Sequence, residues 1–285
     1  MSAKDHNYLS SSSQVTQHRN IENIVNPNDV RKTVLKMLFD AKASHLGSNM
    51  SVIELLVAAY SFADIDEINS ACNSRSRVIV SKGHCAAATY ATMAHFGILQ
   101  FEELSTYHRN GSLLSGHVSH AVKGVEHSTG ALGHGLPVAV GCALGLRFRG
   151  FATKKVFCIV GDGEIQEGSI WEAVMYAAHA NLENLFILVD NNRISSITLT
   201  EHVVNMNPLS KRFEGFGCNV VEVDGHDLQS ITSAVLSCES KGKPNVLICN
   251  TIKGKGIPFA EWEPIWHYRS LTNELYLQAI SNLEI

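Results

Sequence analysis

Two short apolar runs, each followed by oxygen-bearing side chains, constrain the fold of this chain more than any other feature. The run at 156–160 leads to Asp162, which has a glycine on either side, and the run at 185–189 leads to Asn192. Continuous apolar runs of this length are typical of buried parallel strands, and the helical segment between them predicts a β-α-β unit. Because ligands of parallel sheets bind beyond the carboxyl ends of the strands, we expect the two polar side chains to meet there.

These residues predict a site for a hard cation. Asp162, Asn192 and one backbone carbonyl, for which Ile194 is well placed, offer only oxygen ligands. Mg²⁺ and Ca²⁺ prefer oxygen and leave positions open for phosphate, so either ion would carry a diphosphate here. Gly161 and Gly163 allow the backbone to approach such a ligand closely. A lone Gly-Asp-Gly is equally compatible with an ordinary turn, but the strands before both polar residues favour the cation site.

Composition excludes several classes of function. The chain has 285 residues, of which 45% are apolar and 18% charged, and its formal net charge is -4, so nothing in it indicates nucleic-acid binding. Its apolar segments are shorter than the roughly 20 residues of a membrane span. The seven cysteines include no C-x-x-C pair and indicate a reduced, cytoplasmic protein. We expect a flexible polar tail at 1–26 and one domain at 27–285.

Strand and helix patterns alternate along the chain. This alternation predicts an α/β fold with a mostly parallel, doubly wound sheet and helices on both faces. The expected strands are 77–81, 155–160, 185–190, 219–223 and 245–250. The expected helices are 28–43, capped by Asn28 or Asp29, and 51–62, 85–96, 135–148, 169–180, 228–238 and 271–283. The stretch 97–129 has little periodicity, and loops of that length inside compact domains are often functional.

Three of the fourteen histidines lie beside glycine or serine in apparent turns. His45 follows the first helix, His84 follows the first strand, and His117 lies in the long loop. A single histidine is more often a structural or surface residue than a catalytic one. These three local contexts, however, favour a role in chemistry, because an imidazole exchanges protons near neutral pH.

The motifs, in this order, resemble those of transketolases. The Gly-Asp-Gly that precedes an asparagine by about thirty residues is similar to the thiamine diphosphate signature. The resemblance runs from about residue 29 to the C-terminus. It is carried by His45, Lys82-Gly83-His84, Ser115-Gly116-His117, Thr129-Gly130-Ala131-Leu132-Gly133-His134-Gly135, Gly161-Asp162-Gly163-Glu164-Ile165-Gln166-Glu167-Gly168, Asp190-Asn191-Asn192, Val223-Asp224-Gly225-His226-Asp227, Lys253-Gly254-Lys255-Gly256 and Trp266-His267.

This resemblance implies a role for each matching residue. The cation would be held by Asp162, Asn192 and the carbonyl of Ile194. Thiamine diphosphate would be contacted by His84, Gly130, Leu132, Gly163, Asn192, Lys253 and His267. The catalytic residues would be His45, His117, Glu167 and His267. Among these, His45 and His117 would face the donor sugar, and Glu167 would join a carboxylate network that links two active sites across the subunit interface.

Two of these roles have simpler alternatives. Glu167 also fits an ordinary acid at a helix start, which the helix dipole favours. Lys253, like Lys82, either offsets phosphate charge or is a solvated lysine.

Full-length transketolases continue into a second domain that holds the pyrimidine ring, whereas this chain ends at residue 285. The resemblance therefore implies the N-terminal subunit of a split transketolase, completed by a separate C-terminal subunit in an α2β2 assembly. Such an enzyme would transfer a two-carbon ketol unit from a ketose donor to an aldose acceptor. Its substrates would be sugars or sugar phosphates.

Departures from the family pattern leave alternatives open. His45-Leu46-Gly47-Ser48-Asn49 is closer to deoxyxylulose phosphate synthases, which lack Lys-Gly-His, and Tyr268 stands where transketolases have glycine. A decarboxylating two-carbon transfer from a 2-keto acid is one alternative. A noncatalytic scaffold is another, although a scaffold has no need for the polar residues above. A nucleotide-binding dehydrogenase is disfavoured because the glycines at 130–135 have the wrong spacing.

Overall fold

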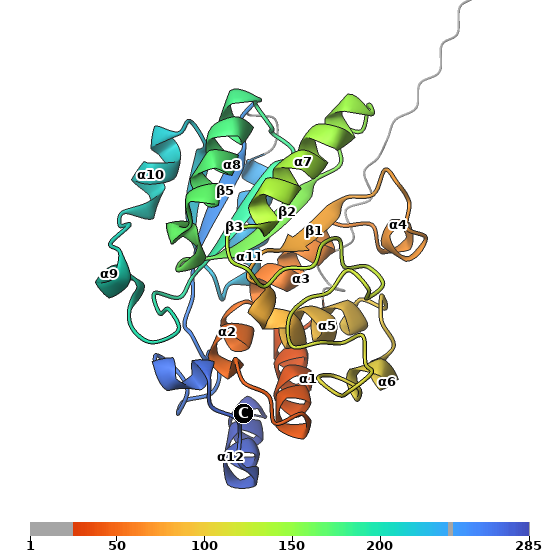
Figure 1. The fold of residues 1–285 in the computed structure, drawn as a ribbon, viewed down its shortest axis with the longest axis vertical. Coiled ribbons are helices and arrows are strands. Elements are labelled where there is room, and N and C mark those ends of the chain that lie inside the picture. Colours follow the sequence, from red (N-terminus) through yellow and green to blue (C-terminus); the bar gives the residue numbers. More distant parts are fainter. Residues whose placement is uncertain (1–24, 239–241, 285) are drawn as a thin grey trace, which may run out of the picture.

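A five-stranded, all-parallel sheet forms the centre of the molecule (Figure 1). The computed structural model describes residues 25–238 and 242–284, so most of the expected tail at 1–26 lies outside the described residues. The strand order is β1-β2-β3-β5-β4. All five predicted strands are present: β1 Arg77–Val80, β2 Val156–Gly161, β3 Leu185–Asn191, β4 Asn219–Asp224 and β5 Asn245–Asn250.

Helices cover both faces of the sheet, which confirms the doubly wound α/β class. The helices α7, α8 and α10 (Leu209–Gly215) pack on one face, and α3, α5 and α11 lie on the other, where α1 packs against α3 and α5 and α12 packs against α1 (Figure 1). Each of the seven predicted helices has a counterpart whose ends lie within about three residues of the expected ones. They are α1 Pro27–Asp40, α3 Ile53–Ser61, α5 Ala86–His95, α7 Gly135–Phe148, α8 Gly168–His179, α11 Leu228–Ser237 and α12 Asn273–Leu283.

The N-cap of the first helix differs from the expectation. Pro27 is the first helical residue, and the side chain of Asn26 accepts a hydrogen bond from the backbone N–H of Asn28. Neither Asn28 nor Asp29 is the cap. Proline suits the first helical position because its fixed φ is helical and its missing N–H would have no partner there in any case.

The sequence did not predict the short helices. They have three to seven residues, which is too few for an apolar periodicity to show. One of them, α6, interrupts the long loop at 97–129 and is stabilised by a capping box between Gln100 and Glu103. The short helices are α2 Leu46–Ser51, η2 Gly83–Cys85, α4 Ile65–Asn69, α6 Phe101–Leu104, η3 Glu164–Gln166, α9 Thr200–Val203, α10 Leu209–Gly215 and η4 Pro264–His267.

The neighbouring strands β2 and β3 are buried along their whole length. Their side chains alternate between the two cores: Phe157 and Phe186 contact one helix layer, whereas Cys158 and Ile187 contact the other. A one-residue slip of either strand would exchange these faces, so burial fixes the register. In that register Gly161 lies opposite Asp190, which places the ends of the two strands side by side.

All seven cysteines are free, and five of them are buried, as expected for thiols of an apolar core. Among the described residues, no helix is both long enough and apolar enough to cross a bilayer.

A buried polar cluster connects the helices α1 and α3 with the end of β5. Arg31 donates to the carboxylate of Glu54 at 2.5 Å, and Nδ1 of His226 lies 3.2 Å from the other oxygen of that carboxylate. Nε2 of His226 accepts a hydrogen bond from the backbone N–H of Ile252, just before Lys253. Burial acts to raise the pKa of Glu54, but His226 and Arg31 together hold it below its ordinary value.

We expect Glu54→Ala to lower the free energy of unfolding by about 3–5 kcal/mol, because it leaves the Arg31 charge buried without its partner. Asp40→Ala is the matched control, since it breaks only an exposed ion pair with Lys36 and should cost less than about 1 kcal/mol. Urea unfolding of both variants measures the difference. Equal losses would contradict the assignment of a buried ion pair.

Candidate active site

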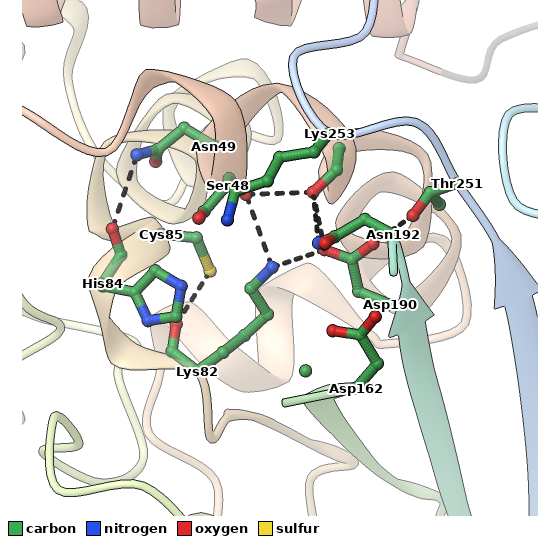
Figure 2. A network of polar contacts seen from close by, with 12 residues as sticks. Ser48, Asn49, Lys82, His84, Cys85, Asp162, Asp190, Asn192, Thr251 and Lys253 are labelled. Carbon is green, nitrogen blue, oxygen red and sulfur yellow. Dashed lines mark hydrogen bonds and ion pairs between the residues drawn. The ribbon is translucent and has the colours of Figure 1, made fainter. Parts of the chain in front are cut away.

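The two polar residues that follow β2 and β3 come together at the carboxyl edge of the sheet. One carboxylate oxygen of Asp162 accepts a hydrogen bond from the backbone N–H of Arg193 at 2.5 Å. The carboxylate therefore lies against the peptide that follows Asn192, and Figure 2 shows both side chains in one polar cluster. The side-chain oxygen of Asn192 in turn accepts from the N–H of Ile194 at 3.1 Å. The expected convergence of these strand ends is present.

The electrostatics of Asp162 favour a cation beside it. The residue is 6% exposed, and burial raises the pKa of its carboxyl to about 7, with the charge of Asp190 adding to the effect. The N–H groups of Gly163 and Arg193 act in the opposite direction. A buried carboxylate near a second carboxylate is stabilised by a positive charge, and its oxygens are ligands that Mg²⁺ and Ca²⁺ prefer. The donor set thus fits a divalent cation.

No cluster of three or more His, Cys, Asp or Glu side chains suited to a metal is present in the described part of the chain. A cation at Asp162 would therefore need the amide of Asn192, a backbone carbonyl and ligand oxygens. The carbonyl of Ile194 lies in the same cluster, where it accepts a hydrogen bond from the ammonium of Lys253 at 2.9 Å.

A buried ion pair lies next to the Asp162 carboxylate. The ammonium of Lys82 contacts the carboxylate of Asp190, and both side chains are almost completely buried (Figure 2). Burial acts to lower the pKa of Lys82 and to raise that of Asp190, but their mutual attraction reverses both shifts. Both groups are therefore charged. Lys82 is thus not a solvated lysine.

Asp190 is a site residue to which sequence reasoning assigned no role. Besides Lys82, its carboxylate accepts hydrogen bonds from Ser51 at 2.6 Å, from Asn192 at 3.3 Å and from Thr251. The available signal was a charged residue at the end of a fully apolar strand. Such a charge is rarely buried without a partner, but the sequence does not say which partner it has.

Lys253 is also buried, so the solvated alternative is wrong for this residue as well. Its side chain is 1% exposed, and its ammonium donates to the carbonyls of Ile194 and Ser195 at 2.9 and 2.5 Å. Burial and the charge of Lys82 lower its pKa to about 8. The stem of Lys253 passes Gly47, where a Cβ atom would lie 2.9 Å from the lysine Cγ. A lysine held there can offset the charge of an anionic ligand.

Four histidines meet although they come from separate segments. The ring centroid of His45 lies 5.5 Å from that of His84, 5.7 Å from that of His117 and 4.9 Å from that of His267. His45 has a left-handed φ of 69°, and its backbone N–H donates to the carbonyl of His267. A non-glycine residue held in this conformation is often part of a functional site. The structure thus unites the four predicted histidines.

The four imidazoles are neutral at pH 7. Burial lowers the pKa of each, neighbouring histidines lower it further, and at His45, His84 and His267 nearby lysines add to the effect. The pKa of His45 falls to about 4 and that of His267 to about 3. A neutral ring carries one donor and one acceptor nitrogen. Nδ1 of His267 is buried and, among the described residues, has no hydrogen-bond partner, so the protein itself leaves this polar atom unsatisfied.

Glycines line the predicted cofactor site for two different reasons. At Gly83 a Cβ atom would lie 2.5 Å from the carbonyl of Thr129, and at Gly130 it would lie 3.2 Å from the ring of His117, so chain packing favours glycine at both. At Gly163 a Cβ atom would make only ordinary contacts, 3.7 Å or longer. None of the described residues requires glycine there, so the close approach of a ligand to Gly163 stays a prediction.

Two further predicted residues lie at the surface of this chain. Leu132 is 37% exposed in the loop before α7. Glu167 is exposed as the N-cap residue of α8, where its side chain makes no capping hydrogen bond. An interface role and the simpler helix-start role both agree with this position, and the interface role stays a prediction.

The chain matches the family described as the thiamine diphosphate binding domain of transketolase over residues 23–275. It is 39% identical over 241 residues to an apulose-4-phosphate transketolase subunit of Actinobacillus succinogenes, covering 84% of this chain and 87% of that protein. It is 35% identical over 260 residues to the 6-deoxy-6-sulfo-D-fructose transketolase subunit SqwG of Clostridium sp. (strain MSTE9), covering 90% and 94%.

Solved structures agree with these matches. The transketolase of Campylobacter jejuni superimposes with a TM-score of 0.82 at 27% identity, and that of Pichia stipitis with 0.80 at 26%. The matches cover 93% and 90% of this chain but only 43% and 40% of those chains, so this chain spans less than half of either solved protein.

The parallel sheet, with its polar cluster at the carboxyl edge, is the fold of a thiamine diphosphate-binding domain. The chain belongs to the transketolase family.

The neutral histidines predict a specific pH dependence of stability. The pKa of His45 is about 4 in the folded chain, against about 6.5 in an unfolded chain. Between these values the unfolded state binds a proton that folded His45 does not bind. The stability contribution of neutral His45 is therefore complete above pH 6.5 and is lost as the pH falls towards 4.

As the pH falls over that range, we expect the free energy of unfolding of His45→Gln to decrease by about 1–2 kcal/mol less than that of the wild type. This figure allows for solvent screening at the half-buried ring. Urea unfolding at several pH values measures this, with the exposed His202→Gln as control. Parallel pH profiles for wild type and His45→Gln would contradict a depressed pKa.

Proposed function

We propose that this chain is the N-terminal subunit of a thiamine diphosphate-dependent transketolase. Together with a separate C-terminal subunit it transfers a two-carbon ketol unit from a ketose donor to an aldose acceptor. The observation that carries this proposal is the match over almost the whole length of relatives that are themselves named as transketolase subunits. The polar cluster and the four histidines supply the chemistry that this function needs.

The residues of the cluster fit the cofactor and its cation. In the proposal, Asp162, Asn192 and the carbonyl of Ile194 hold Mg²⁺ or Ca²⁺, and the cation neutralises part of a diphosphate that Lys253 also contacts. Gly163, Gly130, Leu132, His84 and His267 surround the rest of the cofactor. When bound, thiamine diphosphate supplies the carbanion-stabilising chemistry, and the protein supplies orientation and electrostatics.

The histidines act on the donor in this proposal. His45, His117 and His267 are neutral at pH 7, so each can accept a proton from a donor hydroxyl or donate a hydrogen bond to an oxygen that develops charge. Negative charge brought in by a diphosphate would raise their depressed pKa values towards neutrality. Tyr268, whose ring centroid lies 4.8 Å from that of His267 and which is 63% exposed, would influence the choice of substrate.

The assembly is part of the proposal as well. The partner is the C-terminal, pyrimidine-binding subunit, and two copies of each chain form an α2β2 complex in the cytoplasm. The exposed carboxylate of Glu167 is available for the carboxylate network across the subunit interface. Relatives that are named as subunits of transketolases, and not as whole enzymes, support a separate partner chain.

Asp162→Asn tests the cation site. We expect it to weaken Mg²⁺-dependent binding of thiamine diphosphate at least about 100-fold, because even the outer partners of a metal site are worth about 10- to 100-fold. The variant removes repulsion from Asp190 but places its amide N–H groups against the backbone N–H of Gly163 or Arg193, so urea unfolding is measured beside binding to separate loss of the cation site from loss of the fold. Calorimetric titration with and without EDTA measures binding, and the exposed Asp40→Asn is the control. Unchanged Mg²⁺-dependent binding of thiamine diphosphate by Asp162→Asn would contradict the assignment of Asp162 as a ligand of the cation.

Reconstitution tests the activity. We expect the purified chain alone to cleave no ketose donor, and the chain mixed with its co-purified partner to transfer a ketol unit to an aldehyde acceptor. A donor panel that compares ketol transfer with CO₂ release separates the two chemistries. Turnover by the chain alone would contradict the split enzyme, and CO₂ release from a 2-keto acid would favour the decarboxylating alternative. No turnover with any donor would favour a scaffold.

A further inference from the structure

The carboxylate of Glu164 accepts hydrogen bonds from three separate segments at the edge of the sheet. It lies at the start of η3, directly after Gly163, and is 2% exposed. One oxygen accepts from the hydroxyl of Ser81 at 2.5 Å and from the N–H of Gly133 at 2.9 Å. The other oxygen accepts from the N–H of Gly161 at 3.1 Å. No role in the predicted site was assigned to this residue.

The geometry of these hydrogen bonds suits a carboxylate that only accepts. The hydroxyl oxygen of Ser81 accepts from the N–H of Gly135 at 3.0 Å, so its single proton is free to be donated to Glu164. Both carboxylate oxygens therefore face donors. Burial raises the pKa of Glu164, whereas the hydrogen bonds from Ser81, Gly133 and Gly161 act against that rise. Hydrogen bonds to a charged acceptor are about twice as strong as neutral ones.

Each of the three segments carries residues of the proposed cofactor site. Ser81 comes just before Lys82, and Gly161 just before Asp162. Gly133 belongs to the loop that contains Gly130 and Leu132, and the loop comes so close to the start of α8 that a Cβ atom at Gly133 would lie 2.5 Å from the hydroxyl of Ser169. Its left-handed φ of 81° also favours glycine. The carboxylate is thus a common acceptor for all three segments.

We propose that Glu164 is a positioning residue, which holds the loop at 130–135 and the end of β1 against the cation-binding turn and thereby shapes the diphosphate site. This inference rests on the proposed function for the identity of the ligand. It requires no contact between Glu164 and the ligand. Loss of the carboxylate would loosen the loop and weaken cofactor binding while every contact residue stays in place.

Glu164→Gln is the direct test. Glutamine has nearly the same size, and its single oxygen can still accept from Ser81 and Gly133, but its amide would present N–H groups to the N–H of Gly161. We expect thiamine diphosphate binding with Mg²⁺ to weaken about ten-fold or more in the complex with the partner subunit. The exposed Glu222→Gln on β4 is the matched control and should bind like the wild type.

Hydrogen exchange of the full chain without ligand separates positioning from a general loss of stability. We expect faster exchange of the amides of Gly133 and Gly161 in Glu164→Gln, with exchange in β3 and β5 unchanged. Weaker cofactor binding with unchanged exchange at both glycines would overturn the inference, and so would wild-type affinity. If Glu164→Gln does not fold, Ser81→Ala, which removes one of the three bonds, is judged by the same two readouts.

Failure of the proposed function gives a different result. If the wild-type complex binds no thiamine diphosphate, that function is contradicted. The exchange measurement, which needs no ligand, still decides whether Glu164 holds the loop and the turn together.

Discussion

The carboxylate of Asp190 joins four parts of the chain at the carboxyl edge of the sheet, and the rest of the site depends on it. Its donors are Lys82 after β1, Ser51 at the end of α2, Thr251 after β5, and the side-chain nitrogen of Asn192 after β3. Because a carboxylate only accepts hydrogen bonds, the amide nitrogen of Asn192, and not its amide oxygen, must face Asp190. The amide oxygen of Asn192 is therefore directed towards the N–H of Ile194, on the side of the candidate cation site.

This arrangement fixes the geometry of the site but adds little to the free energy of folding. Removing Lys82 and Asp190 from water costs several kcal/mol per ion, and their attraction roughly offsets that cost. Lys253 and Asp162 are two further buried ionisable groups nearby, and their hydrogen bonds go elsewhere: Lys253 donates to carbonyls, and Asp162 accepts from N–H groups. In the proposed complex these remaining charges serve the anionic cofactor and its cation.

Much of the fold could be predicted because its signals are local. The runs that form β2 and β3, and the polar residues after them, occupy a few consecutive positions, and burial on both faces leaves such strands little choice of register. The motifs around His45, His84 and His117 were also readable in sequence. The short helices were not, because a segment such as α2 spans fewer than two turns.

The parts of the site that sequence reasoning missed depend on contacts between distant residues. Lys82 and Asp190 are 108 positions apart, and Ser81 and Glu164 are 83 apart. Their pairing follows from the parallel order of β1, β2 and β3, which no single motif encodes. The burial of Lys253 depends on its passage beside Gly47, from the other end of the chain. The depressed pKa values of the histidines likewise arise from burial and from one another.

In the proposed function, Asp162 and Asn192 hold one divalent cation that binds a diphosphate. The most direct measurement is a crystal structure of the complex grown with Mn²⁺ and thiamine diphosphate, in which anomalous scattering locates the metal. We expect a single peak within about 2.0–2.6 Å of an Asp162 carboxylate oxygen and the Asn192 amide oxygen, in contact with the diphosphate. A metal bound elsewhere, or a diphosphate bound without contact to it, would contradict this cation site.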